Sequence, residues 1–319
     1  MEKLTIRDFD PKGKRVLMRV DFNVPIEDGR VRDDSRIRAA LPSIVYLLEH
    51  GASIVLMSHL GRPKGKVTDS LRLRPVAQHL SDLIGRPVPA TGDCIGVGTT
   101  DAVNRMKPGQ MLLLENLRFH PEEEANDPEF AAQLAAYGDV YVNDAFGTAH
   151  RAHASTVGVA EILPAYAGLL MEREIRNLSK LLEDPARPFA AIIGGAQVSD
   201  KIKGLESLIE RVDKLGIGGG MANTFLVAQD YTVGKSLRER ERVEDAVKNM
   251  KTVDEKGVEL LLPTDVLVAK EVTRGAEHKV VPVKKIPNSW SAVDVGPDSI
   301  EAFKAALADC ETVLWNGPL

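Results

Sequence analysis

Arginine and histidine side chains follow four short apolar runs in the first half of the sequence. An arginine guanidinium binds planar carboxylate and phosphate groups through paired hydrogen bonds. A single such arginine is more often a solvated surface charge, but its repetition after four runs predicts one shared site for a small anion that carries both groups. The polar residues that follow the runs are Arg19, Asp21 and Asn23, then His59 and Arg62, then Arg118, then His150, Arg151 and His153.

Arg36 joins this set if the segment DDSRIRAA begins a helix. Asp34 or Ser35 would then cap the helix, and Arg36 would lie in the first turn, where free backbone N–H groups also attract anions. Pro42 leaves this helix start open.

The two histidines at the end of the set do not predict a metal site. His150 and His153 flank Arg151, and no pair of carboxylates lies beside them in the sequence. A metal site requires neutral imidazoles with further ligands. We therefore expect these histidines to contact phosphate or to cap a helix.

Glycine-rich segments take the place of arginines in the second half. Glycine lets backbone donors approach a phosphate or nucleotide closely, and Lys201 can supply a positive charge to a phosphate oxygen. These segments therefore predict a nucleotide site. Neither the P-loop nor the dinucleotide glycine spacing is met, which argues against a two-domain dehydrogenase. The segments span residues 194–204, 216–221, 294–299 and 315–319.

Length and composition describe a two-domain protein. The chain has 319 residues, 44% of them hydrophobic, and a formal net charge of −5, which argues against a nucleic-acid binder. Cys94 and Cys310 are isolated and indicate neither a zinc site nor a disulfide framework. No signal peptide or membrane span is apparent, so we expect a cytoplasmic protein that binds neither nucleic acid nor membranes.

The elements that must position these residues alternate between strands and helices. The apolar runs do not alternate with polar residues, which is typical of parallel strands covered on both faces. Leu41, Ile44, Val45 and Leu48 predict a helix before Gly51, and Asp127 before Pro128 predicts another helix start. The expected fold class is α/β, with two doubly wound parallel-sheet domains.

The segment from residue 167 to 183 has helical apolar spacing and is followed by Pro185 and Pro188. We place the domain junction there, although the same pattern fits a core helix equally well. The expected parts are a first domain over 1–166, a helical hinge over 167–185 and a second domain over 186–319.

Several longer strings together closely resemble the motifs of the phosphoglycerate kinase family. They occur in the family's order along nearly the whole chain. They are RVDFNVP, DDSRIRAALPSI, SHLGRP, LLLENLRF, NDAFGTAHRAHAS, GGAQVSDKI, GIGGGMANTF and VLWNGPL. The resemblance implies reversible phosphoryl transfer between 1,3-bisphosphoglycerate and ADP, giving 3-phosphoglycerate and ATP in glycolysis. It also implies a cytosolic monomer whose domains close about the hinge.

The resemblance assigns roles residue by residue. Arg36 and Lys201 would be catalytic, with Arg36 neutralising charge on the transferred phosphoryl group. Arg19, His150 and His153 would form a basic patch beside the substrate. The substrate contacts would be Asp21, Phe22, Asn23, Arg36, His59, Leu60, Gly61, Arg62, Arg118 and Arg151, and the nucleotide contacts Gly195, Ala196, Lys201, Gly219, Gly220, Gly296, Asn316 and Pro318.

Two departures from the family pattern modify these expectations. Gln197 stands where the family has a lysine that contacts the transferred phosphoryl group, so one positive charge is missing. The sequence ends at Leu319, before the family's magnesium-binding loop, so we expect an incomplete second domain and Mg²⁺ that arrives with ADP or ATP without a protein ligand in this chain. The alternative is an impaired chain that binds 3-phosphoglycerate or nucleotide without turnover.

Overall fold

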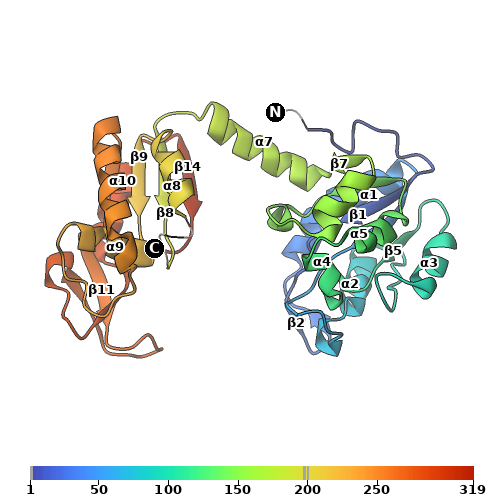
Figure 1. Cartoon of the computed structure of the whole chain (residues 1–319), viewed down its shortest axis with the longest axis horizontal. Helices are drawn as coiled ribbons and strands as arrows, with labels where there is room; N and C mark the ends of the chain where they lie inside the picture. The colour runs from blue at the N-terminus through green and yellow to red at the C-terminus, as the bar shows by residue number, and fades with distance from the viewer. Residues whose placement is uncertain (1–2, 197–198, 200) are drawn as a thin grey trace. The chain divides into compact units, whose positions relative to one another are not determined.

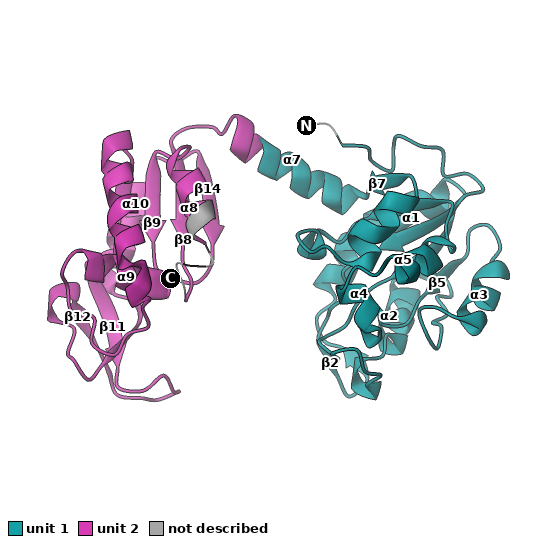
Figure 2. Cartoon of the chain, in the orientation of Figure 1, with its two compact units in different colours: residues 1–179 teal, residues 180–319 magenta. Residues whose placement is uncertain are grey.

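The computed structural model describes residues 3–196, 199 and 201–319. The chain divides into two compact units, Met1–Ser179 and Lys180–Leu319 (Figure 2). The division falls inside helix α7, Leu169–Glu183. Among the described helices, none combines the length and apolar character that a membrane crossing requires.

The first unit contains a five-stranded parallel sheet in the order β5-β4-β1-β6-β7, with a small hairpin of β2 and β3 (Figure 1). The strands are β1 Arg15–Arg19, β2 Ile26–Glu27, β3 Arg30–Val31, β4 Ser53–Met57, β5 Met111–Leu113, β6 Val140–Asn143 and β7 Ala165–Ala167. The helices are α1 Ser35–Glu49, α2 Arg74–Ile84, α3 Val97–Asn104, α4 Pro121–Glu124, α5 Pro128–Ala135 and α6 Val159–Ile162, joined by the short turns η2 Leu117–Phe119 and η4 Ala154–Gly158.

Both faces of this sheet are buried. On β1, Val16 and Met18 belong to one apolar cluster, whereas Leu17 belongs to another. Successive residues of a strand point to opposite faces, so the sheet has a core on each side. The doubly wound arrangement expected from the sequence is thereby confirmed for this unit.

Helix α1 starts at Ser35, but its expected cap is wrong. The Asp34 side chain makes no capping hydrogen bond. Its carboxylate instead accepts a hydrogen bond from Nε of Arg38 at 2.9 Å and lies 2.9 Å from Nε2 of His79. Oδ1 of Asp33 accepts from the backbone N–H of Ser35 at 2.9 Å. The Asp34 carboxylate therefore contacts other side chains, and the carboxylate of the preceding residue bonds to the first N–H group of the helix.

Two of the four apolar residues that predicted α1, Ile44 and Leu48, are buried, whereas Val45 is 37% exposed. Pro42 lies within the helix and does not end it. The buried residues of the helix are Ile37, Ala40, Ser43, Ile44, Leu47 and Leu48. The expected start of α5 is confirmed, since Oδ1 of Asp127 accepts from the N–H groups of Glu129 and Phe130.

Helix α7 buries little of its surface. Met171 is its buried residue, whereas Leu178 and Leu182 are 36% and 52% exposed. This exposure disfavours the core-helix alternative. The hinge role of residues 167–185 stays a prediction.

The second unit combines a parallel and an antiparallel sheet. The parallel sheet has the order β10-β9-β8-β14, and the antiparallel sheet has the order β12-β11-β13. The strands are β8 Phe189–Ile193, β9 Lys214–Ile217, β10 Glu259–Leu261, β11 Asp265–Ala269, β12 His278–Pro282, β13 Ser291–Val295 and β14 Thr312–Asn316. The helices are α8 Ile202–Ile209, α9 Gly219–Ala228, α10 Val243–Lys256 and α11 Pro297–Leu307.

The antiparallel sheet was not expected from the sequence. The segment 294–299 resembled the end of a parallel strand, but β13 runs antiparallel to β11. Within the described residues, β14 pairs with β8 alone, and its Val313 and Trp315 are 45% and 59% exposed. The second unit thus has a strand edge with apolar side chains open to solvent.

Candidate functional site

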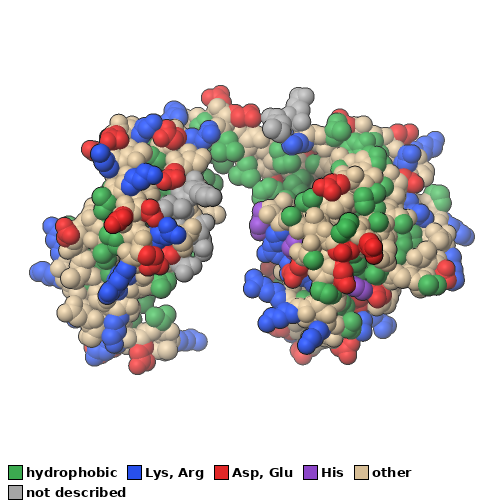
Figure 3. All heavy atoms as spheres, in the orientation of Figure 1, with side chains coloured by type: hydrophobic (Ala, Val, Ile, Leu, Met, Phe, Trp, Pro, Cys, Tyr) green, Lys and Arg blue, Asp and Glu red, His purple; other side chains and the backbone are tan. Residues whose placement is uncertain are grey.

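The central strands of the first unit bring the predicted anion-binding residues to one edge of the sheet. Arg19, the last residue of β1, is in register with Met57 of β4 and with Asn143 of β6. The segments that follow these parallel strands therefore start side by side. Positive and histidine side chains gather along one side of this unit (Figure 3). We call Arg19, Arg36, Arg62, Arg118 and Arg151 the basic cluster.

Arg19 lies at the base of the basic cluster and is only 1% exposed. Its Nε donates to Oγ of Ser155 at 2.9 Å, and its Nη1 donates to the carbonyl of Val20. Its Nη2 lies 3.2 Å from Nδ1 of His59. These bonds fix the plane of the guanidinium group, so Arg19 orients its neighbours instead of meeting a ligand in solvent.

His59 is the electrostatic centre of this site. Burial, and then the positive charges of four arginines, lower the pKa of His59 to about 2. The arginines are Arg19, Arg118, Arg151 and Arg36. A buried imidazole in this field is neutral at physiological pH. Burial is the largest cause of the shift, and the charges of the four arginines add to it.

Arg36 and Asp21 form an ion pair across the site. The Arg36 side chain is 51% exposed, and Nη1 contacts Oδ2 of Asp21. A Cβ atom at Gly147 would lie 2.7 Å from the same Asp21 oxygen. Gly147 therefore lets the loop after β6 approach this pair, and a larger residue there would collide with it.

The loop after β4 is held in place by amide side chains. The N–H of Gly61 donates to Oδ1 of Asn23 at 2.9 Å, and the N–H of Leu60 donates to Oδ1 of Asn116 at 3.1 Å. Nη1 of Arg118 donates to the carbonyl of Gly61 at 2.9 Å. Two candidate contacts from the sequence, Phe22 and Leu60, place their side chains in the apolar core. They can offer only backbone groups to a ligand.

The remaining basic residues differ in their exposure and in their hydrogen-bond partners. Arg62 is exposed, and no described residue forms a hydrogen bond or ion pair with its side chain. Nε of Arg151 lies 3.3 Å from Nε2 of the exposed His150. His153 is buried and precedes η4, with the backbone N–H donating to Oγ1 of Thr156 at 3.0 Å. His153 thus has a role in the helix start, as one of the two sequence expectations had it.

A cavity in the second unit collects glycine-rich segments. Its volume is about 310 Å³. Five predicted nucleotide contacts line it, namely Gly195, Ala196, Gly219, Gly220 and Pro318. Apolar residues such as Leu226 and Val266 form further parts of its wall. Small residues together with apolar residues are suited to a phosphate chain and a planar base.

Lys201 and Asn316 lie next to this cavity. Nζ of Lys201 donates to the carbonyl of Gly194 at 2.7 Å and to Oδ1 of Asn316. Gly296 is not among the residues that line the cavity. It packs against Asp265, and a Cβ atom on Gly296 would lie 2.1 Å from Oδ2 of that carboxylate. Gln197, which replaces the family lysine, lies outside the described residues.

The described lining of this cavity offers little to a metal ion. Asp294 is its one described carboxylate residue. Magnesium in nucleotide sites usually has one or two carboxylates together with phosphate oxygens and waters. The residues present therefore fit an ion carried on the phosphates, and not a cage made of protein ligands.

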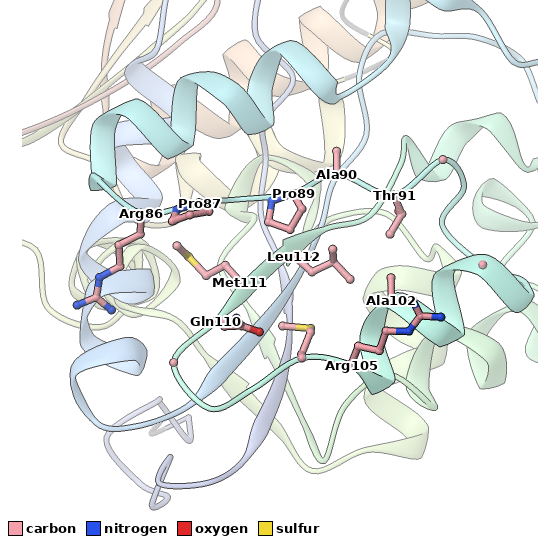
Figure 4. A pocket seen from close by; sticks show the side chains of 14 residues that line it. Arg86, Pro87, Pro89, Ala90, Thr91, Ala102, Arg105, Gln110, Met111 and Leu112 are labelled. Atoms are coloured by element: carbon pink, nitrogen blue, oxygen red, sulfur yellow. The ribbon is translucent and has the colours of Figure 1, made fainter.

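Two further features of the first unit lie apart from the predicted residues. A pocket of about 600 Å³ has Arg86 and Arg105 at opposite ends (Figure 4), and none of the predicted site residues lines it. Asp93, Cys94 and His120 come within 4.8 Å of one another. Burial raises the pKa of the Cys94 thiol well above its usual value, so this sulfur stays protonated and is a poor metal ligand.

Sequence reasoning missed the polar residues that support the site from behind. Asn116 and Ser155 lie inside quoted motifs, but no spacing rule singled them out. Glu123 is fully buried, and its partners are distant in sequence. A short acidic run normally indicates a solvated surface, so only the three-dimensional contacts identify this carboxylate.

Comparison with known proteins agrees with the motif resemblance. The phosphoglycerate kinase family model matches residues 6–319. The chain is 59% identical to the phosphoglycerate kinase of Moorella thermoacetica over 319 residues, which cover 100% of this chain and 81% of that protein. The identity to the enzyme of Gloeothece citriformis is 55%, with the same coverage.

Two solved structures support the same relationship. The phosphoglycerate kinase structure from Coxiella burnetii has a TM-score of 0.85 at 41% identity, covering 99% of this chain and 80% of its own. The structure from Pyrococcus horikoshii has a TM-score of 0.83 at 30% identity, with the same coverage.

Proposed function

The chain belongs to the phosphoglycerate kinase family, and from this membership we propose how its two units divide the reaction between them. The reaction is the reversible transfer of a phosphoryl group between 1,3-bisphosphoglycerate and ADP, which gives 3-phosphoglycerate and ATP in glycolysis. The relatives that match are named as kinases, so they give no support to the alternative of a binding-only protein.

The first unit binds 3-phosphoglycerate in this proposal. The observation that supports it is the convergence of four arginine charges on the buried, neutral His59. A carboxylate and a phosphate on one small molecule are the groups that such a cluster complements. Arg62, which has no described partner, is free to form a bidentate contact.

Arg36 neutralises the phosphoryl group during transfer. Phosphoryl transfer needs alignment and charge stabilisation more than covalent participation by the protein. Asp21 pairs with Arg36 and holds its exposed guanidinium group at the site. Arg118 is largely buried, with 5% of its side chain exposed, and Nε lies 3.1 Å from Oε1 of Glu124.

The second unit binds the nucleotide. Gly195, Gly219 and Gly220 present backbone groups to the phosphates, and Pro318 lies on the same wall. Lys201 lies beside them, and its ammonium group donates to Oδ1 of Asn316. In this proposal Lys201 supplies a positive charge to the phosphates. Gly296 acts only indirectly, through its packing against Asp265.

The family uses its nucleotide substrates with Mg²⁺. When bound on the phosphates, the ion offsets their negative charge. The segment 167–185 serves as the hinge about which the two domains, 1–166 and 186–319, close to exclude water. We further propose that the protein is a cytoplasmic monomer that binds neither nucleic acid nor membranes.

Steady-state kinetics with single variants test this division. Arg62→Ala should raise KM for 3-phosphoglycerate about tenfold or more and leave KM for ATP within twofold, because it removes a charged contact to one substrate only. Asn316→Ala should show the opposite pattern. Arg86→Ala, an arginine of the other pocket, is the matched control. Parallel changes in both KM values would contradict the division.

A further inference from the structure

A row of buried hydrogen bonds lies behind His59 and connects three elements with the loop after β4. Glu123 lies on α4, Ser155 on η4 and Arg19 at the end of β1. Oγ of Ser155 donates to Oε1 of Glu123 at 2.6 Å, and Nε of Arg19 donates to Oγ of Ser155 at 2.9 Å. Nη2 of Arg19 then meets Nδ1 of His59 at 3.2 Å. The row therefore ends at the ring that lies in the basic cluster.

The direction of each bond in this row is fixed by chemistry. A guanidinium group has only donors, so Nδ1 of His59 must accept. A ring that accepts at Nδ1 and is neutral carries its proton on Nε2. His59 is 3% exposed, so solvent does not compete strongly for Nδ1. The contact with Arg19 thus selects one tautomer.

Glu123 anchors the other end of the row. It is fully buried, and its two oxygens accept from the backbone N–H of Ser155 at 2.9 Å and from its hydroxyl. Within the described residues, no carboxylate contacts Arg19 directly. The hydroxyl group of Ser155 therefore lies between the positive charge of Arg19 and the negative charge of Glu123 that offsets it.

Burial alone would raise the pKa of Glu123, but the contact with His153, the charge of Arg19 and the bonds from Ser155 outweigh it and lower the pKa. Nδ1 of His153 lies 3.7 Å from Oε1 of Glu123. Glu123 is thus a buried anion inside a site whose other charged groups are mainly cations. An anion there opposes the binding of a negative substrate, but its hydrogen bonds connect it to Arg19 through Ser155.

We propose that Glu123 is a positioning residue that acts through Ser155 and Arg19 to hold His59 as a neutral Nε2–H donor for 3-phosphoglycerate. This inference rests on the proposed function of the first unit. It means that His59 contributes a directed hydrogen bond without taking up a proton. The neighbouring arginines supply the positive charge.

Nitrogen-15 NMR of histidine-labelled protein without ligand tests the row directly. The protonated and unprotonated ring nitrogens have distinct shifts, so the spectrum reports the tautomer of His59, assigned with His59→Gln. We expect the Nε2–H tautomer alone in the unaltered chain. Ser155→Ala and Glu123→Gln should give a mixture of tautomers, and Glu122→Gln, on the same short helix, should not.

Calorimetric titration of 3-phosphoglycerate into the same variants tests the consequence. Ser155→Ala and Glu123→Gln should weaken binding about tenfold, as for the loss of one hydrogen bond to a charged group. The control should bind within twofold of the unaltered chain. If Glu123→Gln does not fold, as judged by circular dichroism, Ser155→Ala decides.

The outcomes separate this inference from the proposed function. A single Nε2–H tautomer in a folded Ser155→Ala chain would overturn the inference, whatever the affinity. Mixed tautomers with unchanged affinity would overturn the role in binding. Normal binding by His59→Gln would instead contradict the assignment of the substrate site itself.

Discussion

In the first unit the edge of the sheet where β1 and β4 end has arginines around a histidine, whereas in the second unit the cavity has glycines and apolar side chains. The first arrangement acts through charges on long side chains. The second acts through backbone groups that are accessible only because no Cβ is present. One site should therefore be sensitive to lost charge, and the other to added volume.

The two arrangements also differ in what supports them. Buried side chains such as Arg19 and Glu123 hold the first site from behind. In the second site, the close approach of backbone segments fixes the positions of the groups that line the cavity. A Cβ on Gly220 would lie 2.5 Å from the carbonyl oxygen of Ala196. Each site is consequently vulnerable to a different kind of substitution.

The largest expected effect is on turnover and follows from removing one charge in the first unit. Arg36→Ala should lower kcat by roughly 10² to 10³, the usual effect of losing one group that stabilises developing negative charge. Arg38→Ala, on the same helix but paired with Asp34, should stay within twofold. A coupled ATP assay measures both. An equal loss of kcat in the two variants would contradict a specific role of the Arg36 charge in turnover.

An added methyl group should be the damaging change in the second unit. Gly219 has a φ of +62°, and a Cβ there would lie 2.9 Å from the N and O atoms of Gly195. The left-handed conformation alone costs about 1–2 kcal/mol for other residues, so Gly219→Ala should weaken ADP binding about tenfold or more. Calorimetry measures this affinity.

The control for that change is Gly204→Ala. This glycine lies in α8, and apart from its chain neighbours and the backbone of its own helix no atom lies within 4 Å of where its Cβ would be. Its ADP affinity should be unchanged. If both alanine variants bind ADP like the unaltered chain, the second site does not depend on close backbone approach.

Acid should destabilise the first unit through His59. The folded pKa of about 2 lies below the ordinary value of 6.5, so the unfolded chain binds more protons between these values and stability falls as pH falls. The groups that face His59 are Arg19, Arg118, Arg151 and Arg36. Between pH 6 and 5 we expect a loss of roughly 1.2 kcal/mol.

Hydrogen exchange of the β1 peptide at several pH values measures this loss, and His59→Gln should flatten the dependence. The pKa of Glu123 is lowered from 4.5. The stability that this carboxylate contributes is therefore lost only as the pH falls below 4.5, outside the interval from pH 6 to 5. An identical slope in the His59→Gln variant would contradict the electrostatic account of the site.

The smallest expected effect lies at the boundary between the two units. Leu178 is 36% exposed on α7, so Leu178→Ala should change the free energy of unfolding by less than about 0.5 kcal/mol. Met171 is buried on the same helix, and Met171→Ala should cost about 2 kcal/mol or more. Urea denaturation compares them. Equal costs would identify α7 as a core helix.

The sequence predicted what depends on strand ends and charge. Parallel strands carry their following residues to one edge, so the positions of His59 and Arg118 could be inferred without coordinates, whereas Arg36 was placed by the expected helix start. The antiparallel pairing of strands β11 to β13 could not be inferred, because a short apolar run does not indicate whether its strand pairs in the parallel or the antiparallel direction. The contacts of Glu123 with Ser155 join residues 32 positions apart, and no local pattern encodes them.

The central claim is that the basic cluster of the first unit binds 3-phosphoglycerate. Calorimetric titration of 3-phosphoglycerate into the chain and into an Arg36→Ala, Arg62→Ala double variant tests it most directly, with Arg38→Ala as the control. The account predicts saturable heat in the chain and in the control, and its loss in the double variant. Unchanged binding by a folded double variant would contradict the account.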